Sequence, residues 1–277
     1  MLHSSRRSPG RDQATPLVAA FLSICALSFL GVPVAVLVGR AVLGGSLAAE
    51  TSDPAIGDAL ALSLLATAAS LVLTVTFGTP LAYLLARRRW PGRALVEALI
   101  DLPVVLPPAV AGLALLLALG RNGLFGGLLH DMGIELPFTT GAVVLAQTFV
   151  AAPFYIRSAR TGFAAVPSDL EDAARVDGGS EPAVFRLVTV PLASSALAAG
   201  LVLSWARALG EFGATIMFAG NVQGLTQTLP LLVYGQFQSS LDASIAAAAI
   251  LVVAAFGVLV AIRLVHWRSA VELRSVL

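Results

Sequence analysis

Two charged residues lie inside a long apolar stretch of this sequence, where charges are unfavourable and therefore informative. Arg207 and Glu211 are four residues apart, so on a helix they lie on one face and are close enough to pair. Such a pair could fix the packing of helices, or it could line a polar route through the apolar region. Neutral hydrogen-bonding side chains follow, namely Thr215, Asn221, Thr226, Gln227 and Thr228. They could contact a passing solute weakly, or they could only satisfy the local backbone.

Residues for covalent, metal or nucleotide chemistry are scarce. Cys25 is the single cysteine, and His3, His130 and His266 are too scattered to predict a metal cluster. The sequence contains no lysine, which the phosphate-binding loop of ATPases requires. A formal net charge of +1 gives no basis for binding nucleic acid. We therefore predict no catalytic residues, no metal site and no cofactor in this chain, and an intramembrane enzyme is disfavoured because no suitable constellation of residues occurs.

A polar segment, residues 165–191, separates two apolar runs and has the pattern of two short helices. Ser168 and Glu171 have the spacing of a capping box, which predicts that a helix starts there. Gly178 and the glycine after it allow a sharp bend. Ser180 can cap a second helix, in which an early proline is tolerated because the first backbone amides lack internal partners.

The order of residues in this segment resembles the EAA loop of ABC importer permeases. In that loop Glu-Ala-Ala precedes three residues, a glycine, nine residues and then Ile, any residue and Leu-Pro. The sequence here has Asp for Glu and Val at both aliphatic positions, which keeps the charge and the branched apolar character. In that family the loop sits in a cleft of the ATP-hydrolysing subunit and passes its closure to the membrane helices. The resemblance implies ATPase-coupling roles for Asp172, Ala173, Ala174 and Gly178, with Glu171 as an alternative acid; an ordinary helical hairpin is the other interpretation.

A second resemblance concerns residues 205–230 together with Leu106, Pro107 and Pro108. These residues are similar to the permeases of molybdate ABC importers, whose relatives carry tungstate and sulfate. The similarity covers about residues 55–265, and a tyrosine at Phe212 would instead have favoured sulfate. It implies an oxyanion pathway formed by Pro107, Pro108, Arg207, Glu211 and Thr215. In this pathway Arg207 would attract a dianion.

The elements that must position these residues are membrane spans. The sequence of 277 residues is 57% hydrophobic and only 12% charged, with a mean hydropathy of +0.89, which is typical of integral membrane proteins. Several apolar runs are long enough to cross about 30 Å of hydrocarbon. The six predicted spans are residues 17–38, 59–86, 95–119, 140–159, 192–219 and 243–265.

Arginines gather in alternate connections between these runs. Only Arg40 and Arg121 fall in the opposite connections; the biased set is Arg6, Arg7, Arg11, Arg87, Arg88, Arg89, Arg93, Arg157, Arg160, Arg175, Arg186, Arg263, Arg268 and Arg274. The positive-inside rule then places both termini and residues 165–191 in the cytoplasm, in an inner-membrane protein. The first run is too long for the apolar part of a signal peptide, so we expect it to be retained as a span.

Three segments depart from simple spans. Prolines near the start of the third run remove backbone donors, which predicts a broken helix surrounded by protein, either as a tolerated kink or as part of the pathway. Residues 120–137 are rich in glycine and polar residues and are expected at the outer surface. The apolar piece 229–237 is too short to cross, so we expect a re-entrant or surface helix.

Together these features predict an all-α integral membrane protein with the ABC importer permease fold. The permease domain spans residues 16–266, including the coupling loop 165–191, between tails at 1–15 and 267–277. The resemblance implies ATP-binding ABC ATPase subunits on the cytoplasmic side, an outer oxyanion-binding protein, a second permease copy and surrounding lipid as partners. Molybdate is the expected ion, with tungstate or sulfate and thiosulfate as alternatives. An ion-coupled secondary transporter is the rival class, but it would tend to carry acids at the membrane centre within repeated halves.

Overall fold

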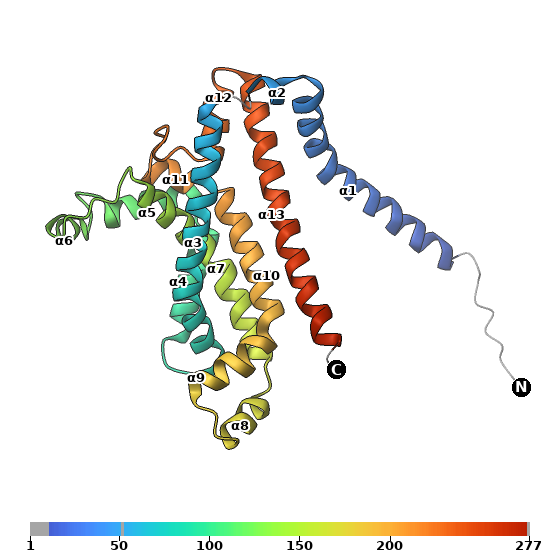
Figure 1. The fold of residues 1–277 in the computed structure, drawn as a ribbon, viewed down its shortest axis with the longest axis vertical. Helices are drawn as coiled ribbons and strands as arrows, with labels where there is room; N and C mark the ends of the chain where they lie inside the picture. Colours follow the sequence, from blue (N-terminus) through green and yellow to red (C-terminus); the bar gives the residue numbers. More distant parts are fainter. Residues whose placement is uncertain (1–10, 51–52, 276–277) are drawn as a thin grey trace, which may run out of the picture.

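The structure is a computed structural model that describes residues 11–50 and 53–275, and their regular secondary structure is helical (Figure 1). The elements are α1 (Arg11–Leu43), α2 (Ser46–Glu50), α3 (Pro54–Arg87), α4 (Arg93–Val105), α5 (Pro108–Leu119), α6 (Gly126–Asp131), α7 (Thr140–Ala165), α8 (Ser168–Val176), α9 (Glu181–Val184), the π-helical turn η1 (Phe185–Thr189), α10 (Val190–Leu209), α11 (Gly213–Phe218), α12 (Leu229–Phe237) and α13 (Leu241–Ser275). The predicted all-α class is confirmed.

Helix α7 is the centre of the bundle, because it packs along both α3 and α10. Its buried positions include several alanines, such as Ala142, Ala146 and Ala159. Small side chains let helix backbones approach closely inside a membrane, where van der Waals packing rather than water exclusion holds helices together. The bundle is therefore organised around the helix that leads directly into residues 165–191.

The predicted number of spans agrees with the structure. Among the described residues, five helices are long and apolar enough to cross a membrane, and the bent pair α4 and α5 brings the number to six. The axes of α4 and α5 differ by 119° across Leu106 and Pro107, so the third span is broken as predicted. The first and last helices reach into the predicted tails, since α1 begins at Arg11 and α13 ends at Ser275.

The fifth predicted span is interrupted before its expected end. Helix α10 ends at Leu209, and a separate helix, α11, begins at Gly213. The Glu211 carboxylate stabilises the new helix start, because its Oε1 atom accepts a hydrogen bond of 2.7 Å from the backbone N–H of Ala214 in the first turn of α11. Residues 192–219 are thus two helices rather than the single span predicted.

The outer halves of the two broken spans pack against each other. Helices α5 and α11 are in contact along their length, and Gly112 and Gly213 make the close approach possible. A Cβ atom added to Gly112 would lie 2.5 Å from the carbonyl oxygen of Ala214, and one added to Gly213 would lie 2.8 Å from the Pro108 Cβ atom. The rest of α5 exposes large side chains on the protomer surface, including Val110, Leu113 and Leu117.

Smaller helices lie at the edges of the bundle. Helix α12 has the bounds predicted for a short helix, and it packs on α13 and on the first turns of α3. Residues 120–137 contain α6 and project sideways from the bundle (Figure 1), with a cavity of about 480 Å³ at their base. Helix α1 leans away from the bundle, so its apolar side chains are exposed in the isolated protomer (Figure 1).

Candidate functional site

Residues 165–191 form a compact structure at one end of the molecule (Figure 1). Helix α8 ends where Gly178 adopts a φ of +88°, in the left-handed region that favours glycine. The predicted pair of helices and the predicted bend are confirmed. The second helix, however, is continuous with the fifth span, because α9 passes through η1 into α10 without a break.

The predicted capping box at the start of α8 is wrong. Pro167 occupies the N-cap position and Ser168 is already the first helical residue. The Glu171 carboxylate does not turn back to the helix start; it lies between α8 and the bundle, with the residue only 3% exposed. The Glu171 side chain therefore makes tertiary contacts instead of the helix cap that the local pattern predicted.

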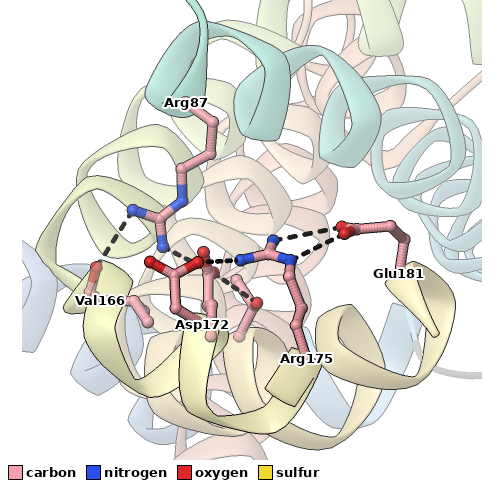
Figure 2. Close-up of polar contacts among 7 residues, drawn as sticks. Arg87, Val166, Asp172, Arg175 and Glu181 are labelled. Atoms are coloured by element: carbon pink, nitrogen blue, oxygen red, sulfur yellow. Dashed lines mark hydrogen bonds and ion pairs between the residues drawn. The ribbon is translucent and has the colours of Figure 1, made fainter. Parts of the chain in front are cut away.

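Glu171 joins α8 to two membrane helices through a single oxygen atom. Its Oε1 accepts a 2.7 Å hydrogen bond from Nη2 of Arg87, the last residue of α3. The same oxygen accepts a 2.6 Å bond from the hydroxyl of Thr189, the last residue of η1. Arg87 also donates from Nη1 to the carbonyl of Val166, just after α7, at 3.1 Å (Figure 2). The ends of α3, α7 and η1 thus meet α8 around one buried carboxylate.

Asp172, the acid that aligns with the EAA loop, is exposed rather than buried. Its side chain is 67% exposed and pairs with Arg175 Nη1 at 2.7 Å. The Arg175 guanidinium also donates to both carboxylate oxygens of Glu181, at 2.7 and 3.2 Å (Figure 2). Hydrogen bonding to Glu181, and then to Asp172, raises the pKa of Arg175 above its ordinary value, so this side chain stays charged.

The outer face of α8 combines these charges with exposed apolar side chains. Leu170 and Val176 are 48% and 87% exposed, and the predicted coupling residues Ala173 and Gly178 are exposed beside them. Large exposed apolar residues next to an ordered charge pair are typical of protein–protein contacts. Helix α8 therefore has one face suited to a partner and another fixed to the bundle by Glu171.

The predicted pathway residues divide into surface and interior positions. Arg207 and Glu211 pair as predicted, with Nη1 and Oε2 2.6 Å apart, and Arg207 is partly exposed while Glu211 is 1% exposed. Thr215 is also buried inside the protomer, whereas Pro107 and Pro108 are exposed. The structure brings the two distant motifs together, because Pro108 lies against Gly213.

Sequence reasoning missed two members of the buried cluster, Arg87 and Thr189. It used Arg87 only as part of the charge bias, and nothing in the local sequence marks Thr189. It also missed the ion pairs that join α4 to α7. Arg157 Nε lies 2.6 Å from Asp101 Oδ1, and Arg160 Nη1 lies 3.0 Å from Glu97 Oε1. These ion pairs join elements that are distant in the sequence, so no local pattern predicted them.

Comparison with known proteins gives a consistent result. A family described as binding-protein-dependent transport system inner membrane component matches residues 78–267. The molybdenum transport system permease protein ModB of Mycobacterium tuberculosis is 46% identical over 204 residues, covering 74% of this chain and 77% of that protein. The protein of the same name from Escherichia coli K12 is 39% identical over 183 residues, covering 66% of this chain and 80% of that protein.

Solved structures show the same fold at low sequence identity. The crystal structure of a bacterial ABC transporter involved in the import of the acidic polysaccharide alginate has a chain that matches with a TM-score of 0.73 at 16% identity. That match covers 93% of this chain and 96% of the other. A second structure, of a bacterial alginate ABC transporter in complex with an alginate pentasaccharide-bound periplasmic protein, matches with a TM-score of 0.70 at 15% identity, covering 91% and 93%.

Proposed function

This chain belongs to the binding-protein-dependent transport system inner membrane component family, the permease subunits of ABC importers, and on that premise we propose that it conducts molybdate across the inner membrane. The choice of molybdate as the substrate rests on the similarity to molybdenum transport system permeases over most of their length. The matched family range also contains both candidate sites, the α8–α9 segment and the Arg207–Glu211 pair.

The cytoplasmic side is the side on which α8 lies. Arg87, Arg88, Arg89 and Arg93 cluster in the connection between α3 and α4, and Arg87 contacts α8 directly. An excess of arginine in a short connection favours the cytoplasm. The beginning of α1 and the end of α13 point toward the same end of the molecule (Figure 1), which supports cytoplasmic termini.

Energy for transport comes from a separate subunit. The sequence lacks the lysine of a phosphate-binding loop, so ATP is bound and hydrolysed by ABC ATPase subunits on the cytoplasmic side. Their contact is the outer face of α8, where Asp172, Ala173 and Gly178 are exposed and Ala174 is half-buried behind them. An outer oxyanion-binding protein delivers the substrate to the opposite side.

The anion passes along the protomer surface where the two broken spans meet. Arg207 attracts a dianion there, while its pairing with Glu211 at 2.6 Å limits the strength of that attraction. A weak site suits a conduit, because an ion that binds tightly leaves slowly. Pro107 and Pro108, exposed at the bend between α4 and α5, lie next to α11 and border the same route.

Reconstitution tests this function directly. The permease is placed in proteoliposomes with its ATPase and binding protein, and ATP hydrolysis and anion uptake are measured with molybdate, tungstate and sulfate. We expect molybdate to stimulate both activities. Stimulation by sulfate alone would contradict the substrate, and no response to any oxyanion would contradict the class of importer.

A further inference from the structure

The attachment of α8 to the membrane bundle depends on one buried carboxylate. Glu171 is 3% exposed, and its Oε1 atom is shared by Arg87 at 2.7 Å and Thr189 at 2.6 Å. These three residues lie on α8, α3 and η1; Thr189 is 18 residues from Glu171, and Arg87 is 84 residues from it. A displacement of α8 therefore acts on two membrane helices through the same atom.

The bonds to Glu171 are stronger than the other polar links of this segment. An ion pair shielded from water is screened little by salt, and removal of one partner leaves a buried charge uncompensated. Arg175, in contrast, pairs with Asp172 and Glu181 at exposed positions, where such pairs contribute little. The exposed pairs shape the surface of α8, whereas Glu171 fixes α8 to the bundle.

The bundle side of this contact is a packed unit. Tyr83 of α3, Phe163 of α7 and Phe185 of η1 form an aromatic cluster with ring centroids 5.0 to 5.9 Å apart. Two of the three pairs have the edge-to-face arrangement that aromatic rings prefer. The ends of these three helices thus form a common base, and a force applied at Arg87 or Thr189 reaches all of them.

Thr189 stands at an irregular point of its helix. It closes the π-helical turn η1, in which the backbone N–H of Val190 donates to the carbonyl of Phe185, five residues earlier. Single π-helical turns inside α-helices are frequent at functional sites. Here the turn presents the Thr189 hydroxyl to Glu171.

We propose that Glu171 transmits the movement of α8 to the membrane helices, with Arg87 and Thr189 as positioning residues that attach it to α3 and to the α9–α10 helix. The inference rests on the proposed function, in which an ATPase subunit moves α8. It also gives the two neighbouring acids different roles. Asp172 contributes to the exposed partner face, and Glu171 passes the motion inward.

The test compares Glu171→Gln, Thr189→Val and the conservative Thr189→Ser in the full complex with its ATPase and binding protein. We expect all three to copurify with the ATPase and to hydrolyse ATP. The anion transported per ATP should fall about fivefold or more in Glu171→Gln, the lower end of typical coupling effects. Thr189→Val, which removes the hydroxyl at nearly constant volume, should lower the same ratio, and Thr189→Ser should retain it.

Glu97→Gln is the matched control. It removes ion pairs with Arg93 and Arg160 at a partly exposed position between α4 and α7, away from α8. Its transport per ATP should equal that of the wild type. An unchanged ratio in Glu171→Gln, an equal loss in Glu97→Gln, or loss of ATPase copurification in Glu171→Gln would each overturn the proposal.

A distance measurement tests the same attachment without any substrate. Spin labels are attached at Ser168→Cys at the start of α8 and Leu84→Cys on α3, both exposed positions outside the partner face of α8, after Cys25 is replaced by alanine. In the complex the distance distribution should stay narrow with and without ATP, and it should broaden when Glu171→Gln is added. A narrow distribution in Glu171→Gln would overturn the attachment, whereas failure of all oxyanions to stimulate the wild type would overturn only the proposed function.

Discussion

Glu211 contacts two partners, one through each of its carboxylate oxygens. One carboxylate oxygen accepts from the Ala214 N–H and starts α11, and the other pairs with Arg207. The residue is 1% exposed, so its charge depends on these contacts rather than on water. The Glu211 carboxylate thus stabilises the start of α11 and is also the counter-ion of Arg207, the residue proposed to attract the substrate.

A double-mutant cycle should expose this dependence. Arg207→Gln leaves a buried carboxylate without its ion partner, so we expect it to destabilise the permease by about 2–4 kcal/mol. The double variant Arg207→Gln/Glu211→Gln should be more stable than Arg207→Gln alone, because no unpaired charge remains. Thermal unfolding in detergent measures the double variant and both single variants against the wild type. Strict additivity of the two single effects would contradict the predicted coupling.

The residue scale also shows which contacts a sequence can reveal. The spacing of Arg207 and Glu211 predicted their pair, which forms although Glu211 lies just beyond the end of α10 rather than on the same helix. The same kind of local pattern misassigned Glu171 to a cap, since its true partner Arg87 is 84 residues away. Pairs across helices carry no spacing rule, so Arg87 and Thr189 could not be predicted to contact Glu171.

At the scale of elements, the contact between α5 and α11 depends on a glycine, Gly112, which has no side chain to separate the two helices. A Cβ atom at Gly112 would meet backbone atoms of Ala214 at 2.5 and 2.8 Å, and a backbone cannot move aside as a flexible side chain can. We expect Gly112→Ala to force the two helices apart and to destabilise the permease by about 1–3 kcal/mol. Thermal unfolding in detergent measures the loss.

Gly57→Ala is the control for this substitution. Gly57 also lies in a helix, α3, but a Cβ atom there would meet nothing within 4 Å. Alanine favours a helix over glycine, so this variant should be as stable as the wild type or slightly more stable. Equal effects of the two substitutions would mean that the contact between α5 and α11 does not limit stability.

The boundaries of helices were predictable where prolines or polar residues interrupt an apolar run of the sequence. The prolines at 107 and 108 predicted the bend of the third span, and the bounds of α12 followed from its flanking polar residues. The end of α10 was missed, because an apolar run gives no sign that Glu211 starts a new helix. Pro191 fits the start of a fifth span by sequence, but it follows directly on a π-helical turn and lies inside a continuous helix.

The whole molecule leaves surfaces that a second copy would cover. Pro107, Pro108 and Arg207 reach the protomer surface, and α5, which begins at Pro108, exposes apolar side chains. A charged side chain inside a membrane faces a protein interface or water rather than lipid. Most soluble assemblies of identical chains are two-fold dimers, and a conduit between two copies would place Arg207 residues from both along one axis.

We therefore expect two copies of this chain in the assembled importer. Native mass spectrometry of the complex purified with its ATPase should show two copies of the 28.4 kDa permease. Purification through a tag on one copy should recover an untagged second copy. A single copy together with a different permease would contradict the symmetric arrangement.

The continuity of α9, η1 and α10 gives the fifth span the geometry of a lever. The rod from Glu181 to Leu209 contains 29 residues, so at 1.5 Å per residue it is about 43 Å long. A tilt of about 5° imposed at the α9 end displaces the other end by about 4 Å over this length. At that other end α10 stops just before Glu211, and the next helix, α11, packs against α5. A rotation of about 5° beside α8 would thereby move the region where α11 meets α5 by about 4 Å, so the proposed coupling needs only a small movement of α8.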